Sequence, residues 1–386
     1  MRIVHIFHNY YPVRGGIERA IERLAEEQVK MGHEVHVITS IHEARDRPRE
    51  EELDGVYVHR VGSWRLYYPD LTIPREIPSG VLEDADVIHG WSQNSYFTYM
   101  MCREAKELGK PIVMYFLGVD YLKHHYNLLI RIFGYLYQKW ITGKVVEMID
   151  LALVTNEYEG KLLKEMHGVD AIVLPHGVDE IYLKLPNMAE YFREKYCIEG
   201  RIIAYIGRIH LTKGLDLLIS AFSEVVGQVP DAVLVVAGKG DEKYLRKCMK
   251  LAEKLGIRNK IRYLGYIPEE DKIALIDAAE AVVLPTRHAG ESYPLLLDEA
   301  LARGKSIIMT ARSKILEYRI KYYENKRKIV TSKSNAQSLA HAIIRLLLKD
   351  KESALTVNRT SNGIKAYSWN DVTRMLVELY NRVIRR

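Results

Sequence analysis

The chain contains 386 residues, of which 48% are apolar and 27% are charged, and its formal net charge is +6. These fractions exclude intrinsic disorder, and no stretch approaches the roughly 20 consecutive apolar residues of a membrane-spanning helix. The charge is spread along the chain, so it fits solubility alone, a phosphate-bearing ligand or an anionic membrane surface. A chain of this length is expected to form two domains with a ligand-binding cleft between them.

Cysteine usage and the first residues indicate the compartment. Cys102, Cys197 and Cys248 lie far apart, without the paired spacing of a zinc site or a disulfide framework, which favours a reducing environment. Residues 2–7 have the character of a buried strand and lack the apolar core and cleavage site of a signal peptide. We therefore expect a cytoplasmic protein, with peripheral binding at the inner membrane surface as an open alternative.

Short β-branched runs alternate with amphipathic stretches through the first half of the chain. Residues 17–31 form the first helical stretch, and the expected strands lie at residues 3–7, 35–39, 56–61, 86–89, 111–116, 151–155 and 171–174. This alternation is typical of a parallel sheet with crossover helices. It predicts a doubly wound, Rossmann-like domain at residues 1–174.

Two features of this first half have competing interpretations. Residues 123–144 mix cations with apolar residues, so they form either a helix that lies on a membrane and presents lipid-linked acceptors, or a domain helix with one buried face, which is commoner. His89 is expected to end a strand at the ligand-binding edge of the sheet. It is either an acceptor contact or a histidine satisfied by a neighbouring carbonyl group.

The second half repeats the pattern, with strands expected at residues 202–206, 233–237, 261–264, 281–284 and 306–309. It predicts a second Rossmann-like domain at residues 175–368. The connection at residues 175–179 carries Pro and Gly directly after a strand, where a chain turns out of one domain into another. Residues 369–386 form a terminal helix with an apolar stripe that must pack on another part of the protein.

The most specific motif is the loop at residues 207–214, Gly-Arg-Ile-His-Leu-Thr-Lys-Gly, which links a buried strand to an amphipathic helix. It lies at the carboxyl edge of the expected second sheet, where ligands of open α/β sheets bind. Arg208 offers a planar fork of donors, Lys213 a compact charge and the helix its free N–H groups, which together suit a diphosphate. A solvated basic loop is the alternative.

A second motif, residues 291–299, follows a strand and opens a helix. Pro294 suits the first helical turn and Ser292 is expected to cap it, so the free N–H groups of that turn would meet the same pyrophosphate. The carboxylates of Glu291 and Glu299 would accept hydrogen bonds from hydroxyl groups at two ends of a sugar nucleotide. An acidic turn that only complements the helix dipole is the alternative.

Together these motifs resemble the retaining glycosyltransferase family 4, and the resemblance covers nearly the whole chain. Residues 11–18 resemble the glycine-rich first loop of the family, residues 264–268 resemble the segment that frames the nucleotide base, and residues 367–370 resemble the start of a C-terminal helix that crosses back to the first domain. The resemblance implies the GT-B fold of the α/β class: two Rossmann-like, doubly wound parallel-sheet domains facing across a cleft. The first domain would bind the acceptor and the second the nucleotide sugar.

The resemblance also implies roles for particular residues. Arg208 and Lys213 would bind the diphosphate, and Glu291 would contact the donor sugar. The residues expected to line the donor site are Gly15, Gly16, Gly207, Gly238, Tyr266, Ile267, Ser292, Tyr293, Pro294, Leu295, Leu296 and Glu299. His89 and Asp120 are the candidates for contact with the acceptor.

The implied reaction moves a hexose from a nucleotide diphosphate sugar to an acceptor hydroxyl group, with retention of configuration and without a metal or other cofactor. The acceptor stays open between a glycolipid or other lipid-linked precursor, a polysaccharide end and a small polyol, and no nucleic-acid partner is expected. The nucleotide base, the sugar and the oligomeric state stay open.

Two segments resemble motifs of other kinds of binding site. Asp84 and Asp86 match a pattern with which other glycosyltransferases hold a metal, but they precede a strand and are interpreted as an ordinary turn at the wrong edge of the sheet. Gly238 and Gly240 open a helix after a strand, as in a dinucleotide fingerprint, but the third glycine is missing. A dehydrogenase is therefore not expected, and this loop would border the donor site.

Two segments depart from the family pattern. Many relatives have a histidine where this chain has Leu117, just before Gly118, and Asp120 is the nearest candidate for a related role. Residues 310–317 lack the glycine pair of relatives, although Glu317 could match their acid. These departures keep open a catalytically silent nucleotide-sugar-binding protein or partner subunit of a transferase. A GT-B epimerase or phosphorylase is a further alternative.

Overall fold

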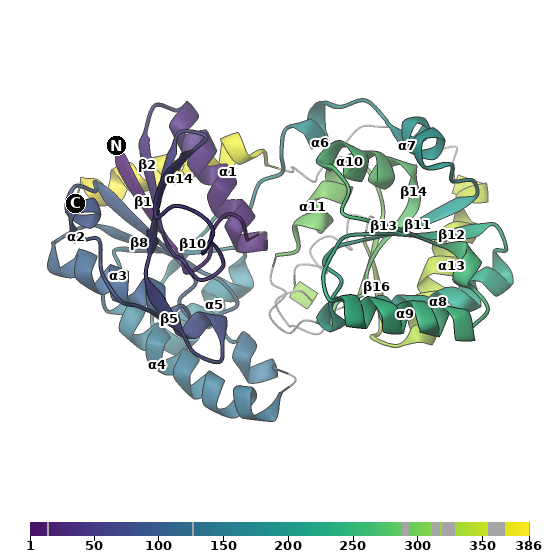
Figure 1. Cartoon of the computed structure of the whole chain (residues 1–386), viewed down its shortest axis with the longest axis horizontal. Coiled ribbons are helices and arrows are strands. Elements are labelled where there is room, and N and C mark those ends of the chain that lie inside the picture. Colours follow the sequence, from purple (N-terminus) through teal and green to yellow (C-terminus); the bar gives the residue numbers. More distant parts are fainter. Residues whose placement is uncertain are drawn as a thin grey trace. The chain divides into compact units, whose positions relative to one another are not determined.

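The structure, a computed structural model, describes residues 1–13, 15–125, 127–287, 293–310, 317–318, 329–353 and 367–385. The chain forms two compact units, one of Met1–Gly177 with Tyr367–Arg386 and the other of Val178–Ala366 (Figure 1). The boundary between them lies close to the expected division at residues 174 and 175. Each unit is a sheet covered by helices on both faces, which confirms the expected α/β class.

The first unit is built on a sheet with the strand order β10-β9-β8-β7-β1-β2-β4-β3. Its strands are β1 (Arg2–Ile6), β2 (Glu34–Ser40), β3 (Glu50–Leu53), β4 (Val56–Val61), β7 (Val87–Trp91), β8 (Ile112–Phe116), β9 (Leu151–Val154) and β10 (Ala171–Val173), and a separate hairpin adds β5 (Ser63–Arg65) and β6 (Thr72–Pro74). The edge strand β3 is antiparallel to β4, whereas the other pairs are parallel. The sequence did not indicate β3, because its Glu-Glu-Glu-Leu stretch has no apolar alternation.

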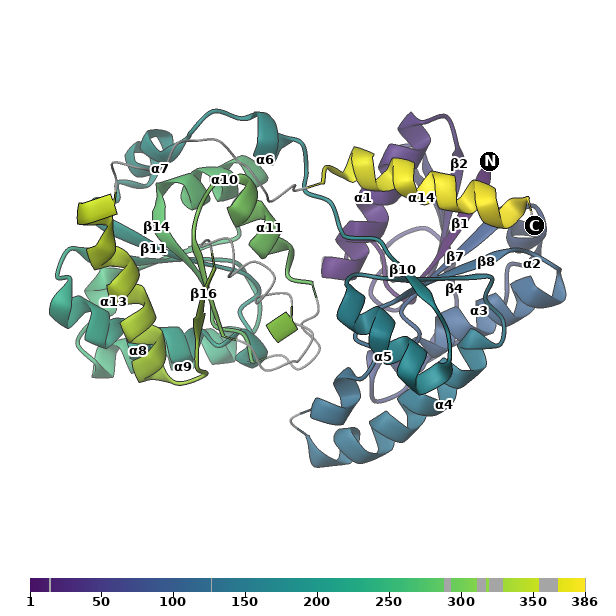
Figure 2. The ribbon, with the colours of Figure 1, turned by 180° about the vertical axis from the view of Figure 1, so that it is seen from behind.

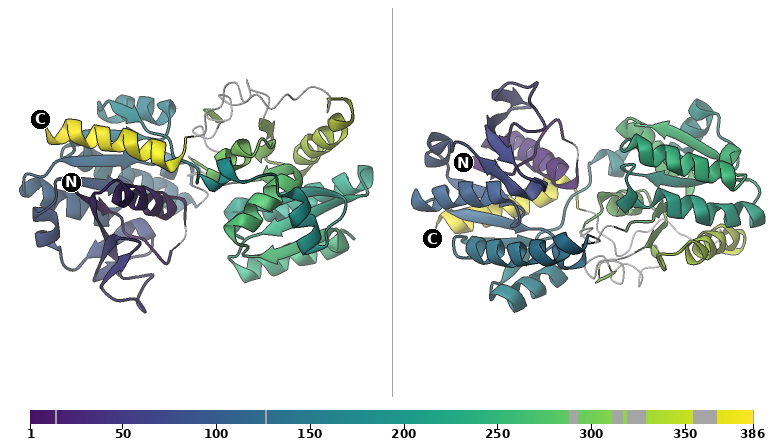
Figure 3. Two further views of the ribbon diagram at one scale, coloured as in Figure 1. Left: turned by 90° about the horizontal axis from the view of Figure 1, so that it is seen from above. Right: turned by 60° about the horizontal axis from the view of Figure 1, so that its bottom comes forward.

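Helices cover both faces of this sheet. They are α1 (Gly16–Lys30), α2 (Ser79–Glu83), α3 (Tyr96–Glu107), α4 (Tyr135–Val146), α5 (Glu157–His167) and α14 (Trp369–Ile384), with the short turns η1 (Pro69–Leu71), η2 (Tyr121–His124) and η3 (Ile130–Gly134). One apolar core joins the strands to α2, α3, α4 and α5. On the other face α14 lies beside α1 (Figures 2 and 3). The terminal helix, expected to cross back to the first domain, is thus part of the first unit.

Polar and aromatic side chains fill the interface under α1 and α14. The ring of His89 stacks on Trp91, with centroids 4.8 Å apart, and its Nδ1 lies 2.5 Å from the hydroxyl oxygen of Tyr380 on α14. Trp91 donates a hydrogen bond to His5, which pairs in turn with Gln28 of α1. This network fixes the position of α14 on the sheet, because buried polar groups need partners in fixed positions.

The second unit has a sheet of parallel strands in the order β13-β12-β11-β14-β15-β16. The strands are β11 (Arg201–Ile206), β12 (Ala232–Ala237), β13 (Ile261–Gly265), β14 (Ala279–Leu284), β15 (Ile307–Thr310) and β16 (Ile329–Ser332). The helices are α6 (Ile181–Lys184), α7 (Ala189–Tyr196), α8 (Leu215–Gln228), α9 (Glu242–Lys254), α10 (Glu269–Ala278), α11 (Leu295–Ala302) and α13 (Ala336–Ser353), with the turns η4 (Leu211–Lys213) and η5 (Arg258–Lys260).

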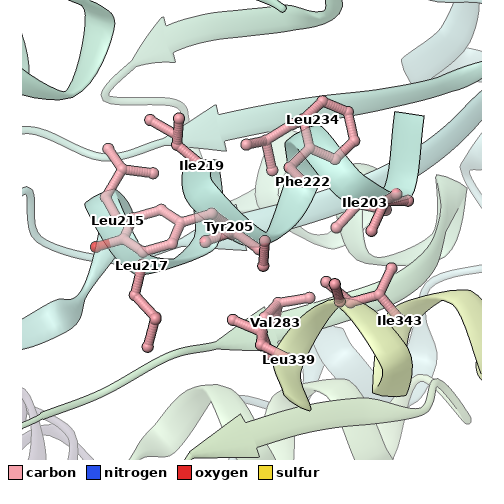
Figure 4. Close-up of a cluster of buried hydrophobic side chains, with 14 of the residues drawn as sticks. Ile203, Tyr205, Leu215, Leu217, Ile219, Phe222, Leu234, Val283, Leu339 and Ile343 are labelled. Carbon is pink, nitrogen blue, oxygen red and sulfur yellow. The ribbon is translucent and has the colours of Figure 1, made fainter. Parts of the chain in front are cut away.

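Both faces of this sheet are apolar, which explains the near-continuous β-branched runs of its strands. One core packs the strands against α8, α9 and α13, and Figure 4 shows Ile203 of β11 near Phe222 of α8 and Ile343 of α13. The opposite core packs them against α7, α10 and α11. In the described part of the chain, no helix is long and apolar enough to span a bilayer.

We predict that Tyr380→Phe lowers the stability of the first unit by about 1–3 kcal/mol, because it leaves the buried His89 without its partner. All four tryptophans, Trp64, Trp91, Trp140 and Trp369, lie in this unit, so denaturation followed by tryptophan fluorescence measures it selectively. The control Tyr57→Phe changes a half-exposed ring and is expected to shift stability by less than about 0.5 kcal/mol. Equal shifts for both variants would contradict the prediction.

Candidate functional site

The two sequence motifs of the second unit follow β11 and β14, which are neighbouring strands of its sheet. The chain runs from β11 outward to β12 and β13, then returns to the other side of β11 to form β14. The connections therefore leave β11 and β14 in opposite directions, which opens a ligand-binding crevice at their carboxyl ends in sheets of this kind. The loop at residues 207–214 follows β11, and the segment that leads to α11 follows β14.

Glycines hold the loops after β11 and β12 together by backbone contact. A Cβ atom on Gly238 would lie 2.0 Å from the carbonyl oxygen of Gly207, and one on Gly240 would lie 2.2 Å from that of Ile209. The N–H of Ile209 donates to the carbonyl of Lys239 at 2.9 Å. No side chain fits between these loops, so Gly207 and Gly238, expected at the donor site, are adjacent.

The same β11 loop is also tied to the end of β14. Gly214 has φ +70°, and a Cβ atom on it would lie 2.1 Å from the carbonyl oxygen of Pro285. The N–H of Arg287 donates to the carbonyl of Thr212 at 2.6 Å, and its guanidinium pairs with Asp216 in the first turn of α8 at 2.8 Å. These contacts fix the loop on both sides of the crevice.

The loop presents two cations. Arg208 is exposed, and no ion pair joins it to another residue of the described ranges. Lys213 is half-buried, and its backbone N–H donates to the backbone carbonyl of His210 at 2.9 Å. Burial, together with the charges of Arg208 and Lys213, lowers the pKa of His210, so this histidine is neutral near pH 7. Within the described residues, the Arg208 guanidinium is thus available to an anionic ligand.

Helix α11 begins at Leu295, and Pro294 is its N-cap, with φ −70° and ψ 109°. The expectation that Pro294 occupies the first helical turn is therefore wrong, because Pro294 has an extended backbone and precedes the helix, whereas the expected cap by Ser292 lies outside the described residues. Leu295 and Leu296 supply the first N–H groups of the helix, which have no intrahelical acceptor. Glu291 and Ser292 lie outside the described residues, and Tyr293 is half-buried beside them.

The remaining donor candidates of the second unit are near the same edge. Glu299 is 4% exposed on α11, and its carboxylate pairs with Lys272 of α10 at 2.7 Å. Lys272 also contacts Glu269, so this carboxylate pair shares one ammonium group. Tyr266 follows β13 with an exposed ring, whereas Ile267 is buried. The position of the Glu299 carboxylate is therefore set by an ion pair within the unit.

In the first unit, the corresponding switch point lies between β1 and β7. His8, directly after β1, bonds Ser95, the N-cap of α3, at 2.9 Å and so joins the two strand ends. Gly15 is the N-cap of α1, and a Cβ atom on it would lie 2.2 Å from a carboxylate oxygen of Glu18. A Cβ atom on Gly16 would meet nothing within 4 Å, so the backbone there is open to a ligand.

The loop after β8 is held by buried polar side chains that the sequence did not single out. Gln93 exchanges hydrogen bonds with both backbone groups of Leu117, at 3.0 and 3.2 Å. The Gly118 N–H donates to Glu159 at 2.6 Å. Burial raises the pKa of Glu159 to about 7, with the charge of nearby Asp120 adding a smaller effect. Asp120, an acceptor candidate, is thus part of a loop fixed by Gln93 and Glu159.

The sequence before Glu159 contains a helix N-cap pattern that could have singled out this residue. Asn156 caps α5, and its side chain accepts from the N–H of Glu159, three residues later. An N-cap residue followed three positions on by Glu is the capping-box pattern, in which the acid usually turns back to its own helix start. Here the carboxylate reaches Gly118 of another loop, which no pattern within α5 could indicate.

His89 does not lie at the edge of the sheet. The expectation that it ends its strand is wrong, because β7 continues to Trp91 and His89 is fully buried beneath α14. Burial holds its pKa well below the usual value, so the ring is neutral. Its partner is the Tyr380 hydroxyl rather than a carbonyl group, and the contact is structural.

Asp84 and Asp86 lie at the amino end of β7, and both bind Arg2. The Arg2 guanidinium pairs with Asp84 at 2.6 Å, and the Arg2 N–H donates to the carboxylate of Asp86 at 2.7 Å. This confirms their interpretation as a turn at the edge opposite the carboxyl ends of the strands.

Comparisons with known proteins agree with this architecture. Residues 14–181 match the family model "Glycosyltransferase Family 4", and residues 190–363 match the model "Glycosyl transferases group 1". The chain belongs to glycosyltransferase family 4. It is 27% identical to the phosphatidyl-myo-inositol mannosyltransferase of Mycolicibacterium smegmatis, over 99% of this chain and 94% of that protein.

Solved structures show the GT-B fold for this glycosyltransferase. The sucrose-phosphate synthase of Thermosynechococcus elongatus superposes with a TM-score of 0.76 at 19% identity, covering 100% of this chain and 99% of that one. Anabaena HepE in complex with UDP-glucose gives a TM-score of 0.75 at 15% identity, covering 99% and 100%.

We predict that Gly214→Ala displaces the β11 loop of the glycosyltransferase, because its methyl group would overlap the Pro285 carbonyl. Hydrogen–deuterium exchange is expected to speed up at the Arg287 amide, which bonds Thr212. Gly256→Ala is a matched control: Gly256 has φ +71°, so it incurs a similar backbone strain of about 1–2 kcal/mol, but nothing lies within 4 Å of its Cβ position. Unchanged exchange in Gly214→Ala would refute the contact.

We also predict a pH dependence that Glu159→Gln removes. The folded-state pKa of about 7 lies above the ordinary glutamate value of 4.5, so the stabilising effect of the proton is full below pH 4.5 and is lost as the pH rises through about 7. The free energy of unfolding is expected to fall by an amount on the order of 3 kcal/mol over this pH range. It is measured as the difference in tryptophan-detected denaturation between wild type and variant at pH 5 and pH 8, in which other titrating groups cancel. A difference that does not change with pH would show that Glu159 ionises normally.

Proposed function

We propose that this glycosyltransferase moves a hexose from a nucleoside diphosphate sugar to a hydroxyl group of a lipid-linked acceptor, with retention of configuration and without a metal. The observation that carries the proposal is the pair of cations, Arg208 and Lys213, on a loop fixed between the ends of β11 and β14. A diphosphate is the ligand that two cations at such a switch point suit best.

The proposed donor site lies in the second unit, and the roles of its residues follow the family resemblance. Arg208, Lys213 and the N–H groups of Leu295 and Leu296 bind the diphosphate, since a helix N-terminus carries a partial positive charge. The ribose lies at Glu299, and the base lies along the backbone after β13, at Tyr266 and Ile267. Glu291, which lies outside the described residues, and Tyr293 contact the sugar. The UDP-glucose bound to HepE, which has the same fold, supports a nucleotide-sugar donor.

These groups also account for the chemistry of the leaving group. Negative charge develops on the departing diphosphate, and Arg208 and Lys213 stabilise it from positions that the folded loop sets in advance. Loss of one such group typically costs about 100-fold or more in rate. With these cations in place, the proposal requires no cofactor.

The acceptor is assigned to the carboxyl edge of the first sheet, where Asp120 lies on the loop held by Gln93 and Glu159. The relative named phosphatidyl-myo-inositol mannosyltransferase supports a lipid carrying a polyol headgroup. An enzyme with such an acceptor works at the inner surface of the cytoplasmic membrane as a peripheral protein.

A second candidate function rests on Leu117. Its buried apolar side chain replaces the histidine of many relatives, so a protein that binds nucleotide sugars without transferring them is the competing proposal. A turnover assay distinguishes the two proposals. Only a transferase would release UDP, GDP or ADP from a donor in a reaction that depends on the acceptor.

The first test is calorimetric titration with UDP, GDP and ADP in the presence of a chelator. We predict that one nucleotide binds preferentially and that Arg208→Ala weakens its binding at least about tenfold, because a charge-assisted hydrogen bond contributes about 1.5–3 kcal/mol. Arg246→Ala removes an exposed arginine of α9 in the same unit and is the matched control. Binding of no nucleotide, or equal binding by both variants, would overturn the donor site.

A further inference from the structure

The segment between Asp120 and Glu147 has an unusual charge distribution. Its residues 121–146 contain no Asp or Glu. They carry four cations, Lys123, Arg131, Lys139 and Lys144. This segment forms η2, η3 and α4 at the surface of the first unit, and Figure 1 shows α4 at its lower edge. A helical surface segment of this length without a carboxylate presents only positive charge.

The same segment exposes large apolar side chains along one side, here named the α4 face. Its members are 49% to 66% exposed: Leu128, Leu129, Ile132, Phe133, Leu136 and Trp140. Leu128, Ile132, Leu136 and Trp140 follow one another at intervals of four, which places them on one side of a helix. The opposite side is buried and includes Gln138, Ile141 and Val145. The segment is therefore a domain helix with one buried face, as one sequence interpretation predicted, and it also has an apolar face exposed to solvent.

A neighbouring segment extends this apolar surface. Tyr67 is 87% exposed and Leu66 is 55% exposed, in the connection between β5 and β6. The next residue, Tyr68, joins this connection to η2, because its hydroxyl lies 3.1 Å from that of Tyr121 and its ring packs edge-on against His125. An exposed apolar patch of this extent marks an interaction surface in a monomeric protein.

The cations around the α4 face are largely available to a partner. Lys144 pairs with Glu147, and Lys123 lies over the ring of Tyr135. Within the described ranges, no ion pair engages Arg131 or Lys139. Two copies of this face would bring like charges together, whereas an anionic surface complements them. Apolar and aromatic side chains flanked by Lys and Arg are typical of helices that lie in the interface of a bilayer.

We propose that the α4 face docks this protein on a bilayer that contains anionic lipids, with Phe133 and its apolar neighbours inserted among the headgroups. The inference deepens the peripheral position proposed above and rests on the proposed function for its lipid-linked acceptor. It names the surface that makes the contact and the lipid charge that it selects.

The α4 face is connected directly to the loop assigned to the acceptor. On the buried side of α4, the Gln138 amide donates to the carbonyl of Gly118 and to Asn94, both at 3.0 Å. The Gln138 oxygen accepts from the N–H of Leu122 at 3.3 Å. A helix that rests on the membrane thus holds the loop of Asp120 at a fixed position relative to the lipid surface, so that a lipid headgroup can be reached without leaving the bilayer.

The test is co-sedimentation of the full chain with vesicles of phosphatidylcholine alone or mixed with phosphatidylglycerol. Wild type is expected to bind the mixed vesicles and to bind pure phosphatidylcholine much more weakly. Leu129→Ser with Phe133→Ser is expected to weaken binding at least about tenfold, because two inserted side chains are lost. Leu183→Ser with Leu348→Ser changes exposed apolar residues of the second unit and is the matched control.

Charge is tested separately by Arg131→Gln with Lys139→Gln. Each basic residue near an anionic surface contributes about fivefold in affinity, so the pair is expected to lower binding to mixed vesicles about thirtyfold. Binding to phosphatidylcholine is expected to change little. Equal losses on both vesicle types would overturn the assigned lipid charge.

Two further outcomes overturn the proposal. In one, wild type binds neither vesicle. In the other, light scattering shows a dimer that Leu129→Ser with Phe133→Ser dissociates, without vesicle binding, so that a second copy covers the face. Nucleotide calorimetry on the wild type keeps the two proposals apart. A wild type that binds nucleotide but no vesicle rejects the docking surface alone, and one that binds vesicles but no nucleotide rejects the donor site alone.

Discussion

The packing of Gly214 on the carbonyl of Pro285, and of Gly238 on that of Gly207, fixes the loop that carries Arg208 and Lys213 in the second unit. These contacts bring the ends of β11, β12 and β14 to van der Waals distance with no side chains between them. The cations of the 207–214 loop are thereby held at the switch point of the sheet before any ligand arrives. Preorganised charge of this kind is effective because it needs no rearrangement when a ligand binds.

The first unit fixes its corresponding loop by a different physical means. Gln93, Gln138 and Glu159 bind the backbone of residues 117–122 with buried side-chain hydrogen bonds. Such a network is specific but depends on the protonation of one carboxyl group, Glu159. Both sheets have a switch point beside their first strand, and they differ in how they hold the loops at their carboxyl edges, one by glycine contact and one by buried polar groups.

Two helices of the first unit, α14 and α4, make buried polar contacts with other parts of that unit. Helix α14 is anchored by His89 through Tyr380, and this contact ties the last helix of the chain to the central strands. On the other face of the sheet, α4 links an exposed apolar surface to the acceptor loop through Gln138. One unit thus combines a surface suited to lipid with the loop proposed to receive the acceptor.

Local patterns in the sequence predicted much of this protein. The alternation of β-branched runs with amphipathic helices predicted both Rossmann-like sheets, and the resemblance of several motifs predicted the family and the GT-B fold. The placement of Arg208 and Lys213 after a strand also followed from the sequence, because the carboxyl edge of a parallel sheet is where its loops meet. Asp84 and Asp86 were assigned to a turn on the same ground.

Only the tertiary structure decided features that depend on which elements become neighbours. No periodicity shows that His89 lies under α14 rather than at an edge, that Glu159 reaches Gly118, or that Glu299 pairs with Lys272. The sequence left α4 with two interpretations, because apolar spacing alone does not say which side of a helix is covered. Burial, charge pairing and pKa arise from contacts between residues far apart in the chain, so the sequence determined the framework and its cationic loop, and packing decided the environment of each side chain.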